Sequence, residues 1–150
     1  MREARTLGGW VIALFLAAML VWVAIDTLAP PTGTKNHLFQ LFADASGIAY
    51  FEPTGRLAVG VLEVLVALLV FIPFTRRFGA ILGVLLMTGL AALVVQLMML
   101  KVDIPVDVIG EGGAVSTTTT DPSALFYLVL GLLIASLTLI FVHPGKDEPT

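Results

Sequence analysis

Residues 55–71 read GRLAVGVLEVLVALLVF, an apolar run that carries one carboxylate, Glu63. The run is hydrophobic enough to lie in lipid, where an ionisable side chain costs a few kcal/mol. Glu63 is therefore expected to face a protein interior, a partner or a wet cavity. The fold and the function both depend on what surrounds this carboxylate.

The composition is that of an integral membrane protein. Of the 150 residues, 58% are hydrophobic and only 13% are charged, and the mean hydropathy is +1.01. The net charge of −3, without a basic run, excludes a nucleic-acid partner. The chain has no cysteine, so redox chemistry would have to come from a partner or a bound cofactor.

Four apolar stretches are long enough to cross a bilayer as helices, which takes about 20 residues each. We place these spans at about 6–26, 56–74, 77–100 and 123–142. The first stretch is longer than the apolar region of a signal peptide and lacks a small-x-small cleavage site, so we interpret it as a retained helix. The expected fold is a single all-α domain over residues 1–150, built as a four-helix transmembrane bundle. Its surroundings are the lipid bilayer.

The two longer loops carry patterns of their own. In the first, apolar residues at helical spacing predict a short amphipathic helix that lies at the membrane surface or caps the bundle; they are Leu38, Leu41, Phe42 and Ala45. In the second, apolar and polar residues alternate over 102–108, a glycine-rich turn follows at 110–113, and residues 114–119 return. This pattern predicts a β-hairpin. Asp121 and Pro122 then provide a cap and a first-turn proline for the last span.

Arginines set the expected orientation. Arg2 and Arg5 precede the first span, and Arg76 and Arg77 lie in the turn after the second. Because positive charge accumulates on cytoplasmic loops, the N-terminus and this turn are expected in the cytoplasm. Four spans then return the C-terminus, with His143 and Lys146, to the same side.

The candidate site is a polar stripe on the second span. Arg56, Gly60 and Glu63 fall on one face of an ideal helix. Gln96 on the third span is the expected cross-helix partner of Glu63, at matching depth. Glu63 has three interpretations: a proton acceptor beside a quinone-like ligand, a polar anchor for a partner subunit, or a buried carboxylate that only holds helices together.

Other motifs point to structure rather than chemistry. Gly79 and Gly83 form a small-xxx-small pattern that indicates close helix packing, with homo-oligomerisation as the second interpretation. His37 and His143 are too far apart in sequence to indicate a metal site. No nucleophile–base pair, phosphate loop or dinucleotide fingerprint is present. We therefore assign no catalytic residue, no metal and no cofactor beyond the quinone hypothesis, and expect no enzymatic activity from this chain alone.

Three segments together resemble the DoxX-like family of small bacterial four-helix membrane proteins. They are FEPTGRLAVGVLE at 51–63, ALL at 67–69 and RFGAIL at 77–82. Members often show Glu-Pro-x-x-Arg-x-x-x-Gly-x-x-Glu, a short turn, Gly-Ala-x-Leu and a later Leu-Phe, here Leu125-Phe126. A histidine that is frequent near the end of the third span is Gln96 here.

The resemblance implies a multi-pass protein of the bacterial cytoplasmic membrane with a link to redox metabolism. The leading hypothesis is a non-catalytic membrane subunit, or a bundle that binds a small quinone-like ligand, with a membrane or redox protein as partner. The alternatives are a small proton-coupled transporter, in which Glu63 couples to substrate movement, and a purely structural assembly protein.

Overall fold

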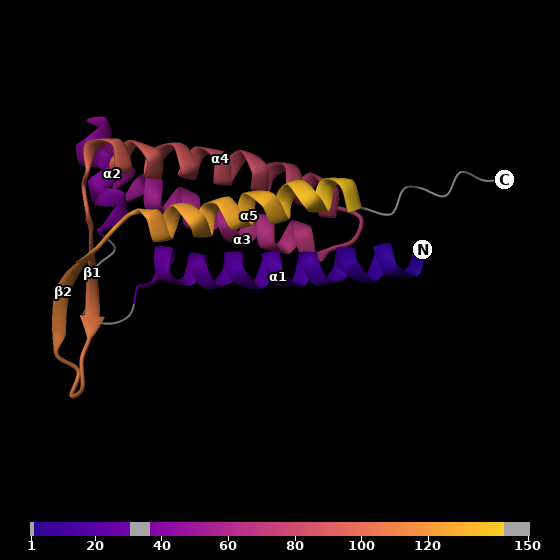
Figure 1. The fold of residues 1–150 in the computed structure, drawn as a ribbon, viewed down its shortest axis with the longest axis horizontal. Coiled ribbons are helices and arrows are strands. Elements are labelled where there is room, and N and C mark those ends of the chain that lie inside the picture. The colour runs from indigo at the N-terminus through magenta and orange to yellow at the C-terminus, as the bar shows by residue number, and fades with distance from the viewer. Residues whose placement is uncertain (1, 31–36, 143–150) are drawn as a thin grey trace.

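Four long helices lie side by side in the computed structural model, which describes residues 2–30 and 37–142 (Figure 1). They are α1 (Arg2–Leu28), α3 (Thr54–Phe71), α4 (Arg76–Leu100) and α5 (Ser123–Val142). Each contains a stretch long and apolar enough to cross a membrane. The predicted fold class is confirmed, and the ends of the four candidate membrane-spanning helices lie within three residues of the expected spans, the largest difference being 74 against 71.

The predicted loop elements are also present. The amphipathic helix is α2 (Leu38–Ser46), followed by a short 3₁₀ turn, η1 (Ala49–Phe51). The hairpin consists of β1 (Ile104–Ile109) and β2 (Val115–Thr120), which pair antiparallel. Its turn contains Gly112 and Gly113 at φ +87 and +81. Glycine adopts this left-handed conformation without the steric cost of a side chain.

The four helices form a closed ring. Helix α1 packs against α3 and α5, and α4 packs against the same two helices from the other side. The start of α1, the α3–α4 turn and the end of α5 share one end of the bundle (Figure 1). Helix α2 and the hairpin lie at the opposite end, where the hairpin runs across the helix direction.

Two apolar clusters fill the interior. The larger one lies between the four long helices and includes Leu16, Leu20, Val66, Val70, Met87 and Leu139. The smaller one joins α2 to the hairpin end of α4 and consists of Phe39, Phe42, Val94, Leu97 and Ile104 with their neighbours. Because both phenylalanines of α2 are almost fully buried, this helix caps the bundle rather than lying free on a surface. Many large apolar side chains on the outside of the helices stay exposed, as a lipid-facing surface requires.

Gly79 and Gly83 allow close contacts inside the chain. A Cβ at Gly79 would lie 2.8 Å from the Val70 backbone nitrogen, and one at Gly83 would lie 2.8 Å from Ser136 Oγ. The small-xxx-small pattern thus serves the packing of α4 on α3 and α5. This confirms its interpretation as a close-packing motif, whereas homo-oligomerisation stays a prediction.

The arginines of the α3–α4 turn have different environments. Arg76 is buried, donates from Nε to Val70 O at 3.0 Å, and lies with its guanidinium carbon 4.1 Å from the Trp10 ring centre. Arg77 is exposed. The side chains of Arg2 and Arg5, and residues 143–150 with His143 and Lys146, lie outside the described part of the chain. The cytoplasmic orientation stays a prediction.

Candidate functional site

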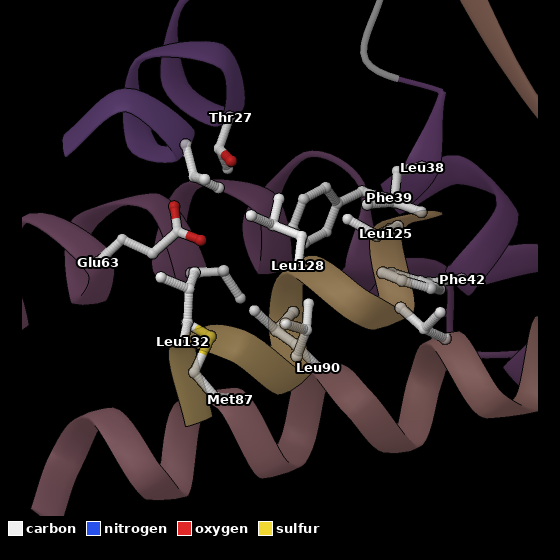
Figure 2. Close-up of a pocket in the computed structure, with 14 residues that line it drawn as sticks. Thr27, Leu38, Phe39, Phe42, Glu63, Met87, Leu90, Leu125, Leu128 and Leu132 are labelled. Carbon is white, nitrogen blue, oxygen red and sulfur yellow. The ribbon is translucent and has the colours of Figure 1, made fainter. Parts of the chain in front are cut away.

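Glu63 lies on the buried face of α3, close to the middle of the helix. That face also carries Gly60, Ala67 and Val70, so the carboxylate replaces an apolar residue in a packing position. Its side chain is only 1% exposed. Figure 2 shows the carboxyl group pointing into the space between Thr27, Leu128 and Leu132. Glu63 therefore faces the interior of the bundle and not lipid.

The carboxyl group of Glu63 is only partly satisfied. The side chain of Thr27, in the last turn of α1, forms a hydrogen bond with it. Its Oε2 atom is buried and has no hydrogen-bond partner. Within residues 2–30 and 37–142 no ion pair involves Glu63. A buried oxygen without a partner costs about 1–3 kcal/mol, so this group is not explained by packing alone.

A narrow cavity lies in front of the carboxylate and encloses about 40 Å³ of space that water-sized molecules can reach. A water molecule needs about 10–15 Å³ of such space, so the cavity has room for about three. Glu63 and Thr27 are the two polar residues of its lining. The apolar lining residues are Val23, Leu38, Phe39, Phe42, Val59, Met87, Leu90, Val94, Leu125, Leu128, Val129 and Leu132. The site is thus a small apolar chamber with one carboxylate and one hydroxyl.

Arg56 holds α1 to α3 beside the cavity but does not line it. Its Nε lies 3.0 and 3.1 Å from the two carboxylate oxygens of Glu52, and its Nη1 donates to Thr27 O at 2.7 Å. The last bond fixes the backbone of the residue whose hydroxyl meets Glu63. Arg56 is therefore a positioning residue for Thr27.

Gly60 allows the end of α1 to approach α3 closely. A Cβ at this position would lie 2.6 Å from the side chain of Leu28 and 3.2 Å from that of Thr27. The end of α1 therefore occupies the space beside Gly60. The glycine brings Thr27 within reach of Glu63.

The expected contact between Gln96 and Glu63 is wrong. Gln96 Nε2 donates to Ala45 O at 3.0 Å and so ties α2 to α4. The reason is depth: Glu63 lies nine residues into α3, about 13 Å from its start, whereas Gln96 lies four residues, about 6 Å, from the end of α4. Gln96 therefore contributes to the cap over the cavity and not to its lining.

Sequence reasoning missed Thr27, the actual polar neighbour of Glu63. The first span predicted from the sequence ends at residue 26, so Thr27 falls just outside it. The available signal was its place on the face of α1 that also carries the buried residues Ala13, Leu20 and Ala24. A hydroxyl on the packing face of a membrane helix indicates a cross-helix hydrogen bond.

The sequence of nearly the whole chain matches one protein family. Residues 5–142 match the family described as methylamine utilisation protein MauE. The chain belongs to the MauE family. This is a DoxX-like family of membrane proteins, so the resemblance found in the sequence is confirmed at that level. Searches of curated proteins and of solved structures give no significant match.

The MauE match covers every element that builds the cavity, from α1 to α5.

A second hollow, of about 180 Å³, lies at the base of the hairpin and is lined by Met98, Lys101, Asp103, Asp121 and Pro122. Asp121 lies just before α5 and accepts a hydrogen bond from the Ser123 backbone nitrogen at 2.7 Å. Hydrogen bonds with Ser123, first with its side chain and then with its backbone, lower the pKa of this carboxyl group. No group of three or more metal-ligating side chains occurs within the described ranges.

Proposed function

We propose that this chain is a non-catalytic membrane subunit of methylamine-linked redox metabolism, with a binding cavity for a small polar molecule between its helices. The family description supplies the metabolic context. The observation that carries the binding role is the unpartnered Oε2 of Glu63, whose side chain lines a cavity with otherwise apolar residues and one hydroxyl. Buried polar groups without partners are rare in folded proteins, and each one calls for an explanation such as a functional role or a bound ion or water.

The size of the cavity favours a small molecule over a quinone ring. Pockets for ligands of drug size enclose about 300–1,000 Å³, whereas the space in front of Glu63 is about 40 Å³. A quinone headgroup is larger than this space. Quinone binding is thus the less favoured form of the ligand hypothesis.

The remaining alternatives receive less support. A polar anchor for a partner helix has to reach the outside of the bundle, and Glu63 is 1% exposed. Transporters of the common folds place their substrates at broken helices, and each long helix described here is continuous. A partner subunit would instead meet the hairpin, where β2 is exposed along its entire length.

Deletion of the coding sequence from its host tests the metabolic role. We expect growth to fail when methylamine is the nitrogen source and to stay normal on ammonium. The wild-type gene on a plasmid should restore growth, and so should Glu111→Gln, a change in the exposed hairpin turn. Normal growth of the deletion strain on methylamine would refute the proposed function.

The orientation is part of the proposal, with the α3–α4 turn in the cytoplasm and the hairpin outside. The chain has no cysteine, so a single introduced cysteine is the only residue that a thiol reagent can label. We expect a membrane-impermeant maleimide to label Glu111→Cys in intact cells lacking an outer-membrane barrier, and Phe74→Cys only after the membrane is opened. The reverse labelling pattern would show that the bundle is inserted the other way round.

A further inference from the structure

We propose that the Glu63 cavity binds a small primary alkylammonium cation of the size of methylammonium. This inference deepens the proposed function and rests on it for the metabolic context. The occupant is argued from three properties of the cavity: its polar groups, its apolar lining and its size.

The polar groups fit an ammonium head. Glu63 Oε2 is an acceptor that lacks a donor, and within the described ranges no lysine or arginine forms an ion pair with this carboxylate. An ammonium group brings positive charge and three N–H donors. Bonds from such a cation to a carboxylate are charge-assisted and about twice as strong as neutral ones. The hydroxyl oxygen of Thr27 is a second acceptor in the same lining.

The remainder of the cavity fits a carbon atom and not a hydrated ion. The other residues of the lining are all apolar, and Figure 2 shows Leu128, Leu132 and Met87 around the Glu63 carboxyl group. Metal cations such as Mg²⁺ and Ca²⁺ require about six or more oxygen ligands. Two polar side chains do not provide them. A methyl group, by contrast, gains from leaving water for such a surface.

Size limits the class of amine. The cavity holds about three water-sized positions, by the same measure as above. Methylammonium, with one carbon and one nitrogen, fits that space. A longer chain such as n-butylammonium exceeds it, and so does a quaternary cation such as tetramethylammonium. The cavity should therefore discriminate among amines by length as well as by charge.

Equilibrium binding of ¹⁴C-methylammonium to the purified full-length protein in lipid nanodiscs tests this inference. We expect saturable binding that unlabelled methylammonium displaces and that n-butylammonium does not. Glu63→Gln removes the charge but keeps the shape and should weaken binding about 30-fold or more. Thr27→Val removes only the hydroxyl and should weaken it about tenfold. Glu111→Gln, in the exposed hairpin turn, should bind as the wild type does.

Three outcomes would overturn the inference. They are the absence of saturable binding to the wild type, equal affinity in Glu63→Gln, and equal displacement by n-butylammonium. If Glu63→Gln does not fold, Thr27→Val and the series of amines still decide the question. A strain that needs this gene for growth on methylamine, combined with a protein that binds no methylammonium, would retain the proposed function and discard this ligand.

Discussion

Glu63→Leu is expected to stabilise the protein and to abolish its function. The carboxylate occupies a packing position of α3 and leaves one buried oxygen without a partner. Replacing it by an apolar side chain of similar size removes a cost of about 1–3 kcal/mol. The free energy of unfolding, measured by denaturant titration in mixed micelles, should therefore rise by about that amount. Growth on methylamine should fall to the level of the deletion strain.

This pair of measurements separates a binding residue from one that only holds helices together. If both oxygens of Glu63 were satisfied and held helices together, its loss would lower the free energy of unfolding, because Thr27 would lose its partner and no unpartnered oxygen would be removed. Glu111→Leu is the matched control, since its side chain is exposed in the hairpin turn and its effect should stay within about 0.5 kcal/mol. A destabilised Glu63→Leu protein that still supports growth would contradict the account.

Gly79→Ala should destabilise the bundle by about 1–3 kcal/mol. A Cβ there would lie 2.7 Å from Leu69 Cβ and 2.8 Å from the Val70 nitrogen. Backbone atoms cannot move aside as a flexible side chain can, so α3 and α4 have to separate, and overpacking of this kind costs about 1–3 kcal/mol. The same micelle titration measures the change in the free energy of unfolding.

Gly89→Ala on the same helix provides the control for Gly79→Ala. No atom lies within 4 Å of a Cβ built at Gly89, and alanine is favoured over glycine inside a helix by up to about 1 kcal/mol. The two substitutions should therefore change stability in opposite directions. Equal effects would mean that the close contact between α3 and α4 does not exist.

The fold could be predicted from the sequence because a chain segment in lipid has to satisfy its own backbone hydrogen bonds. Four apolar runs of about 20 residues each are expected to cross a membrane as helices, and the four long helices begin and end close to the expected residues. The hairpin was predictable from alternation over 102–108 and from Gly112 and Gly113, which suit a turn. These signals are local, so they can be read without knowing which helices are neighbours.

The site was harder to predict from the sequence because it depends on which helices are neighbours and on how far along each helix the polar residues lie. The sequence predicted that Glu63, a carboxylate in an apolar run, faces the protein interior, and the structure buries its side chain. It did not indicate that α1 rather than α4 provides the polar neighbour, since nothing local to Gln96 or Thr27 fixes their height relative to Glu63. The sequence places Gly60 on the same helix face as Glu63, but its neighbour, Leu28, follows only from the packed helices.

The most direct measurement of the central claim is the distance between a bound amine nitrogen and the Glu63 carboxyl carbon. Solid-state NMR can obtain it from ¹⁵N-methylammonium and protein labelled at glutamate Cδ, reconstituted in lipid. A charge-assisted hydrogen bond of about 2.8 Å to the carboxylate oxygen places the nitrogen about 3.5 Å from that carbon. The account predicts this dipolar contact in the wild type and its loss in Glu63→Gln. A contact that persists in Glu63→Gln, or no contact in the wild type, would contradict it.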